Sequence, residues 1–162
     1  MMSRRTALIT GGTGGLGFHA AGALIAAGGW DVLITGRSAV ADTAARLGGS
    51  ATGRHLDLGS LAEVRRFAAD LPPLDAVICN AGLMKVSGAA VTGDGIEETF
   101  AVNHLAHFLL VQEVLPTMPA PGRVVFVSSA THDPARRTGF PAPQYTSAHE
   151  LTHPGDTAAE SP

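Results

Sequence analysis

The sequence has few of the residues that stabilise small secreted proteins or bind nucleic acids. Cys79 is the single cysteine among 162 residues, so no disulfide can form within the chain, and a reducing compartment is expected. It lies in the apolar run 76–79, where a buried structural thiol is a simpler interpretation than a catalytic one. The net charge is −3, and no basic patch carries interleaved aromatic residues, so we expect no nucleic acid partner.

Long apolar runs are also missing. No stretch reaches the roughly 20 residues that a membrane-spanning helix needs. Residues 1–6 lead directly into a strand-like run, without the apolar segment of a signal peptide. We therefore expect a cytoplasmic protein that does not contact a membrane. Hydrophobic residues make up 45% of the chain and charged residues 15%, a balance that suits one domain with a buried core.

Strand-like and helix-like segments alternate along most of the chain. Short apolar runs predict strands at 7–10, 31–35, 53–58, 75–79 and 123–127. Helical spacing and capping residues predict helices at 15–27, 40–47, 60–71 and 96–115. Apolar strands that alternate with helices form a parallel sheet covered on both faces. The expected fold is therefore a doubly wound α/β sheet of five strands, in the order 3-2-1-4-5.

The composition changes after residue 130. Five of the ten prolines lie between residues 131 and 162, which predicts a long loop with at most a short helix at 147–151. A domain rarely ends in a structureless tail of this length. We therefore divide the chain into a nucleotide-binding domain, 1–130, and a proline-rich loop or insertion, 131–162, and expect the fold to be truncated at its C-terminus.

A glycine-rich turn, residues 10–17, joins the first predicted strand to the first predicted helix. Glycines at this point allow a tight turn and let the backbone approach a pyrophosphate, which then faces the positive end of the helix. The alternative is a turn of the same shape without a ligand. The strand before the turn and the helix after it favour a dinucleotide site. The candidate contacts are Gly11, Thr13, Gly15, Leu16 and Gly17.

Further motifs follow this turn in order and at fitting distances. They are Asp57-Leu58 after the third strand, Asn80-Ala81-Gly82 at the end of the fourth, Asn103 in the long helix and Ser128-Ser129 after the fifth. Together with the spacing Gly11-x-x-x-Gly15-x-Gly17, they resemble the short-chain dehydrogenase/reductase family over residues 6–129. The resemblance implies a Rossmann fold. It also implies cofactor contacts at Asp57, Leu58, Asn80, Ala81 and Gly82, and catalytic roles for Asn103 and Ser129.

Two stretches, 103–108 and 129–132, are most similar to the branch that contains retinol dehydrogenases and protochlorophyllide reductases. This similarity implies hydride transfer between a nicotinamide cofactor and a carbonyl or hydroxyl group of a small, apolar substrate. It also implies that the full-length form is a homo-oligomer.

Residues after the second predicted strand favour NADP(H) over NAD(H). An acidic residue at this point would bind the ribose 2′-hydroxyl of NAD, whereas an arginine accommodates the 2′-phosphate of NADP. The chain has Gly36 where an acid would stand, followed by Arg37 and Ser38. A guanidinium can pair with a phosphate through two hydrogen bonds. The alternative is that Arg37 is only an exposed surface residue.

The family's Tyr-x-x-x-Lys motif is where the resemblance breaks. Tyr145 is the single tyrosine, and His149 stands four residues later, whereas the single lysine is Lys85. Without a nearby positive charge, a tyrosine with a pKa near 10 is a poor base at neutral pH. In one interpretation Tyr145 is catalytic and His149 replaces the lysine. In the other, Tyr145 belongs to an insertion, and the true motif lies further on, in sequence that this chain does not contain. The chain would then be an inactive nucleotide-binding module or a truncated fragment.

The remaining histidine pairs do not predict a metal site. His149 and His153 are four residues apart and could share a helix face, but no convincing third ligand accompanies them. His104 and His107 lie in the longest predicted helix beside apolar residues, which favours packing or a substrate pocket. We therefore expect no resident metal.

Overall fold

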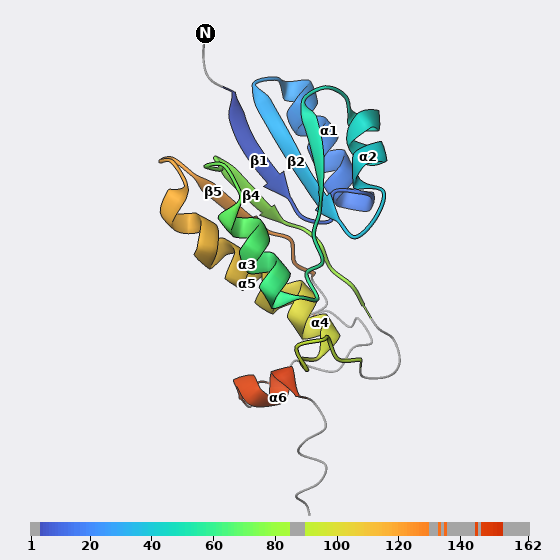
Figure 1. Cartoon of the computed structure of the whole chain (residues 1–162), viewed down its shortest axis with the longest axis vertical. Helices are drawn as coiled ribbons and strands as arrows, with labels where there is room; N and C mark the ends of the chain where they lie inside the picture. Colours follow the sequence, from blue (N-terminus) through green and yellow to red (C-terminus); the bar gives the residue numbers. More distant parts are fainter. Residues whose placement is uncertain are drawn as a thin grey trace, which may run out of the picture.

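The structure is a computed structural model that describes residues 4–84, 90–129, 133, 135, 145 and 147–153. Its elements, in chain order, are β1 (Arg5–Ile9), α1 (Gly15–Ala27), β2 (Trp30–Gly36), α2 (Val40–Leu47), β3 (Ala51–His55), α3 (Leu61–Ala69), β4 (Ala76–Cys79), α4 (Glu98–Phe100), a π-helix (Ala101–Leu105), α5 (Ala106–Val114), a 3-10 turn (Leu115–Thr117), β5 (Arg123–Phe126) and α6 (Ala148–Thr152). All strand pairs are parallel, and the order β3-β2-β1-β4-β5 confirms the predicted topology (Figure 1).

Helices cover both faces of the sheet, whose central strands β1, β2 and β4 are largely apolar and buried (Figure 1). Successive residues of a strand point to opposite faces, so Leu8 and Ile9 of β1 enter different cores. Leu8 belongs to the cluster beneath α3 and α5, which contains Phe67 and Leu110. Ile9 belongs to the cluster beneath α1 and α2. The sheet is therefore held rigidly between two layers, and its strand ends are fixed in position.

The third strand is displaced from its prediction. β3 ends at His55, because β2 pairs with it only as far as Gly36. The apolar residues Leu56 and Leu58, which extended the predicted strand to residue 58, are buried beyond the strand end. Between them, Asp57 turns the chain by accepting a hydrogen bond from the backbone N–H of Gly59 at 2.8 Å. The prediction of a strand over 53–58 was therefore wrong at both ends.

The helix predicted over 96–115 is divided into several pieces. A short α-helix, α4, passes into a π-helix over Ala101–Leu105, and only then does α5 begin. A π-helix adds one residue to a turn, an arrangement that is frequent at functional sites. Here the widened turn contains Asn103, the asparagine singled out in the sequence. Pro116 follows in a 3-10 turn, so the predicted helix end is close to the observed one.

The C-terminal region is described only in part. Ser147 caps α6 by accepting a hydrogen bond from the Glu150 backbone N–H at 3.1 Å, and the short helix expected at 147–151 is confirmed. The Glu97 N–H donates to the Thr152 carbonyl at 2.7 Å, which ties α6 to the segment before α4 (Figure 1). Within the described residues, no helix combines the length and the apolar character needed to cross a membrane.

Candidate functional site

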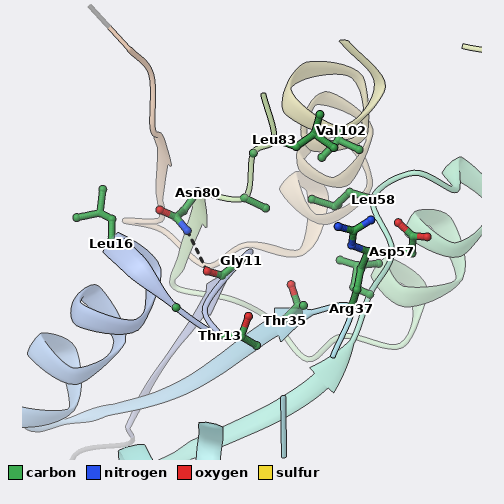
Figure 2. A pocket seen from close by; sticks show the side chains of 15 residues that line it. Gly11, Thr13, Leu16, Thr35, Arg37, Asp57, Leu58, Asn80, Leu83 and Val102 are labelled. Atoms are coloured by element: carbon green, nitrogen blue, oxygen red, sulfur yellow. Dashed lines mark hydrogen bonds between the residues drawn. The ribbon is translucent and has the colours of Figure 1, made fainter. Parts of the chain in front are cut away.

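A cavity of about 390 Å³ opens at the carboxyl ends of β1, β2 and β4 (Figure 2). Its lining comprises Gly11, Thr13, Gly14, Leu16, Thr35, Gly36, Arg37, Leu56, Asp57, Leu58, Asn80, Ala81, Gly82, Leu83 and Val102. The chain continues from β1 to β2 on one side and reaches β4 on the other, so the strand order reverses at β1. In open α/β sheets, ligands bind at such a reversal.

The glycine-rich turn forms one wall of this cavity through backbone conformations that favour glycine. Gly11 and Gly15 have positive φ angles of 65° and 51°. Gly17 is needed for a different reason: a Cβ atom at this position would lie 2.5 Å from the carbonyl oxygen of Gly11. Helix α1 therefore begins directly against the turn. No acidic residue lies in its first turn, so the partial positive charge of its N-terminus is available to an anion.

Asn80 links this turn to the end of β4 through hydrogen bonds. Its side-chain Nδ2 donates hydrogen bonds to the carbonyl oxygens of Thr10 and Gly11 at 2.9 and 3.2 Å (Figure 2). In return, the Thr10 hydroxyl oxygen accepts hydrogen bonds from the backbone N–H groups of Asn80 and Ala81, both at 3.0 Å. Asn80 and Thr10 together therefore hold the glycine-rich turn against the end of β4.

The opposite wall carries Arg37 and lacks a side chain at position 36. A Cβ atom on Gly36 would lie 2.8 Å from Cγ2 of Thr13 and 3.1 Å from its hydroxyl oxygen. An acidic side chain at this position would therefore collide with the glycine-rich turn. Arg37 is exposed and lines the cavity, which leaves its guanidinium accessible to a ligand.

Nine of the twelve predicted cofactor residues line the cavity. Gly15, Gly17 and Ser38 do not; the two glycines shape the turn, and Ser38 is exposed at the end of β2. Other lining residues were not singled out beforehand, namely Gly14, Thr35, Leu56, Leu83 and Val102. Most of these flank a recognised motif, so the chain neighbours of each motif were the signal that could have identified them. Val102, for example, directly precedes Asn103 in the chain.

The three predicted catalytic residues are not gathered in the cavity. Asn103 is exposed and does not line the cavity; its Nδ2 donates to the Leu83 carbonyl and its Oδ1 accepts from the Leu83 N–H, both at 2.8 Å. Ser129 follows β5 and is exposed. Tyr145 is 74% exposed. Neither Ser129 nor Tyr145 lines the cavity. The structure therefore assembles the predicted cofactor site more completely than the predicted catalytic group.

His149, the residue that would replace the catalytic lysine, does not line this cavity either. The His149 ring stacks on that of His153 at 4.7 Å. In the described parts of the chain, no three histidine, cysteine or acidic residues gather to hold a metal ion. Lys85 lies outside the described residues. Burial raises the pKa of the Cys79 thiol to about 12, which keeps it protonated and unreactive at neutral pH.

The family model for short chain dehydrogenases matches residues 5–148, which include every strand, the glycine-rich turn and the predicted catalytic residues. The chain belongs to the short-chain dehydrogenase family. This establishes the resemblance that the motifs suggested. It also places the cavity within the matched region.

Curated relatives of this short-chain dehydrogenase include both members of the predicted branch. Protochlorophyllide reductase B from rice is 38% identical over 145 residues, which cover 80% of this chain and 36% of the relative. Human retinol dehydrogenase 13 is 36% identical over 140 residues, covering 79% of this chain and 42% of that protein. The short-chain dehydrogenase described here thus spans less than half the length of these relatives.

Solved structures share the fold. A protein from Mycobacterium paratuberculosis superposes with a TM-score of 0.74 at 39% identity, over 80% of this short-chain dehydrogenase and 48% of the solved chain. The active-site complex of RhlG with NADP from Pseudomonas aeruginosa gives a TM-score of 0.60 at 35% identity, over 72% of this chain and 47% of that one. Their fold agrees with the Rossmann-type architecture predicted from the strand and helix pattern.

Proposed function

We propose that this chain binds NADP(H) in the cavity at the ends of β1, β2 and β4 and contributes the cofactor half of an oxidoreductase. The observation that carries the proposal is the pairing of an uncompensated helix N-terminus with Arg37 around one cavity. The first suits a pyrophosphate and the second a 2′-phosphate. The NADP complex of a related enzyme supports the same choice of cofactor. The cytoplasmic location and the homo-oligomeric full-length form belong to this proposal.

The chemistry proposed for the full-length enzyme is hydride transfer between the cofactor and a carbonyl or hydroxyl group of an apolar substrate. A bound nicotinamide supplies or accepts the hydride, whereas the protein binds and orients it. Gly11 and Gly36 line the cavity without side chains, so a dinucleotide can approach the backbone closely at these two positions. We propose that Asn103 and Ser129 position the reacting oxygen, and that Asn103 does so from its anchored place behind Leu83.

The cofactor preference is tested by replacing Arg37. NADPH is expected to bind the unmodified chain more tightly than NADH, by about tenfold or more, because a charge-assisted hydrogen bond contributes roughly 1.5–3 kcal/mol. Arg37→Asp is expected to reverse this order, since a carboxylate repels the 2′-phosphate and accepts a hydrogen bond from the 2′-hydroxyl. Titrations that follow nucleotide fluorescence measure both affinities.

The matched control for this exchange is Arg66→Asp, which makes the same charge change on the exposed surface of α3, outside the cavity. It is expected to leave the preference for NADPH unchanged. Equal affinities of the unmodified chain for NADPH and NADH would contradict the role given to Arg37. The same role would fail if Arg37→Asp lost affinity for NADPH and for NADH to the same extent.

A second candidate function is nucleotide binding without catalysis, favoured by the position of Tyr145 outside the cavity. On this basis the 162-residue chain is expected to show no substantial NADPH-dependent reduction of apolar aldehydes and ketones. The reason is that His149 supplies less positive charge than a lysine to lower the pKa of a tyrosine. Loss of NADPH absorbance over a panel of such substrates measures the activity.

Tyr145→Phe serves as the control in the same assay. Robust turnover that disappears in this variant would make Tyr145 and His149 the working pair. It would overturn the interpretation that Tyr145 belongs to an insertion.

A further inference from the structure

His107 is a buried polar side chain to which the proposed function assigns no role. It lies in α5, with 2% of its surface exposed, and its imidazole makes a hydrogen bond through each nitrogen. Nε2 is 2.8 Å from the hydroxyl oxygen of Thr10, and Nδ1 is 3.2 Å from the carbonyl oxygen of Asn103. These two partners lie behind opposite walls of the cavity.

The direction of each hydrogen bond follows from the partners of Thr10. A hydroxyl oxygen accepts two hydrogen bonds and donates one. The backbone N–H groups of Asn80 and Ala81 occupy both acceptor positions, so the Thr10 proton must be donated. The other available acceptor, the Ile78 carbonyl, is at the long distance of 3.5 Å and already accepts from the Thr10 N–H at 3.0 Å. The acceptor is therefore Nε2 of His107.

This assignment fixes the tautomer of His107. With Nε2 accepting, the neutral ring carries its proton on Nδ1 and donates it to the Asn103 carbonyl. Burial, opposed by the hydrogen bond to Asn103 and assisted by nearby His104, lowers the pKa of His107, which agrees with a neutral ring. A protonated ring would direct an N–H at a hydroxyl whose acceptor positions are filled.

The resulting chain of hydrogen bonds connects the two walls of the cavity. On one side, Thr10 is followed by Gly11, which lines the cavity. On the other side, Asn103 makes two hydrogen bonds of 2.8 Å to the backbone of Leu83, and Leu83 also lines the cavity. Because Asn103 belongs to the π-helix, the hydrogen bond from His107 to the Asn103 carbonyl stabilises this part of the long helix.

We propose that His107, as the neutral Nδ1–H tautomer, is a positioning residue that holds the glycine-rich turn and the Asn103–Leu83 pair in register for the cofactor. This rests on the proposed function, because the wall spacing matters only if a dinucleotide enters the cavity. His107 itself does not line the cavity and acts through Thr10 and Asn103.

Two variants separate this role from mere space filling. His107→Leu keeps an apolar volume but leaves the Thr10 hydroxyl without its acceptor, and it is expected to weaken NADPH binding by about tenfold. His107→Gln places an amide oxygen where Nε2 stood, and it is expected to bind NADPH within about threefold of the unmodified chain. His19→Gln, an exposed exchange on α1 outside the cavity, is the control and is expected to leave NADPH binding unchanged. Thermal melting of each variant confirms that it is folded.

The tautomer provides a readout that does not depend on cofactor binding. In ¹⁵N-labelled, deuterated protein, the His107 ring is expected to show a protonated Nδ1 and an unprotonated Nε2. A proton on Nε2 would overturn the proposal. The proposal would also fail if His107→Leu bound NADPH as tightly as the unmodified chain, or as tightly as His107→Gln. If the unmodified chain binds no NADPH, the proposed function fails, whereas the ring spectrum still decides the order of the hydrogen bonds.

Discussion

Gly17→Ala is expected to lower the melting temperature by roughly 4–10 °C, whereas Gly22→Ala, in the same helix, is expected to raise it by roughly 2–4 °C. A methyl group on Gly17 would meet the Gly11 carbonyl oxygen and the Asn80 amide nitrogen, each at 2.5 Å. Backbone on one side and a hydrogen-bonded side chain on the other leave it no space. The helix or the glycine-rich turn must therefore shift.

Gly22 lies in the interior of the same helix and faces no such obstacle. The nearest atom to its added methyl group would be Cδ2 of Leu47 at 3.8 Å, an ordinary van der Waals contact. Alanine there gains helix propensity without a clash. Because Gly11 lines the cavity, Gly17→Ala is also expected to weaken NADPH binding, whereas Gly22→Ala leaves it unchanged. Calorimetry and nucleotide titration measure the two effects. Equal melting temperatures for both variants would refute the close packing described for Gly17.

The parts of the site that depend on local chemistry could be predicted from the sequence. Glycine is required where a helix starts against a tight turn, so the segment 10–17 predicts the turn that the structure contains. The alternation of apolar strands with helices fixes the class of fold. Arg37 could be named as a candidate cofactor residue because it follows the second strand. The structure shows why glycine precedes it: a Cβ atom at position 36 would lie 2.8 Å from Cγ2 of Thr13.

Other features depend on contacts between residues distant in the chain. The π-helix around Asn103 could not be predicted from the spacing of apolar residues, because a single added residue leaves the pattern over 96–115 nearly unchanged. The end of β3 is decided by where β2 stops pairing, and Leu56 merely continues the apolar pattern beyond it. His107 and Thr10 are separated by 97 positions, so their hydrogen bond could not be foreseen.

The free edge of β5 is expected to make the 162-residue chain self-associate. Within the described part of the chain, β5 pairs with β4 alone, and its end carries exposed apolar side chains, with Phe126 59% exposed and Val127 44%. Phe108 of α5 is 53% exposed as well. An apolar strand edge with few charges, here Arg123 alone, recruits other chains. Each large side chain left in water forfeits ~1.5–3 kcal/mol of burial, against a total stability of about 5–15 kcal/mol. Association therefore offers a substantial gain.

Lysine at two positions of this edge is the direct test. In size-exclusion chromatography with light scattering, the unmodified chain is expected to elute as a dimer or larger species. Val125→Lys with Phe126→Lys is expected to shift it towards the 16.5 kDa monomer, because paired edges would then bring like charges together. Thr52→Lys places one lysine on β3, the opposite and more polar edge of the sheet, and is expected to leave association unchanged. A monomeric, cooperatively melting unmodified chain would show that this edge does not attract other chains in solution.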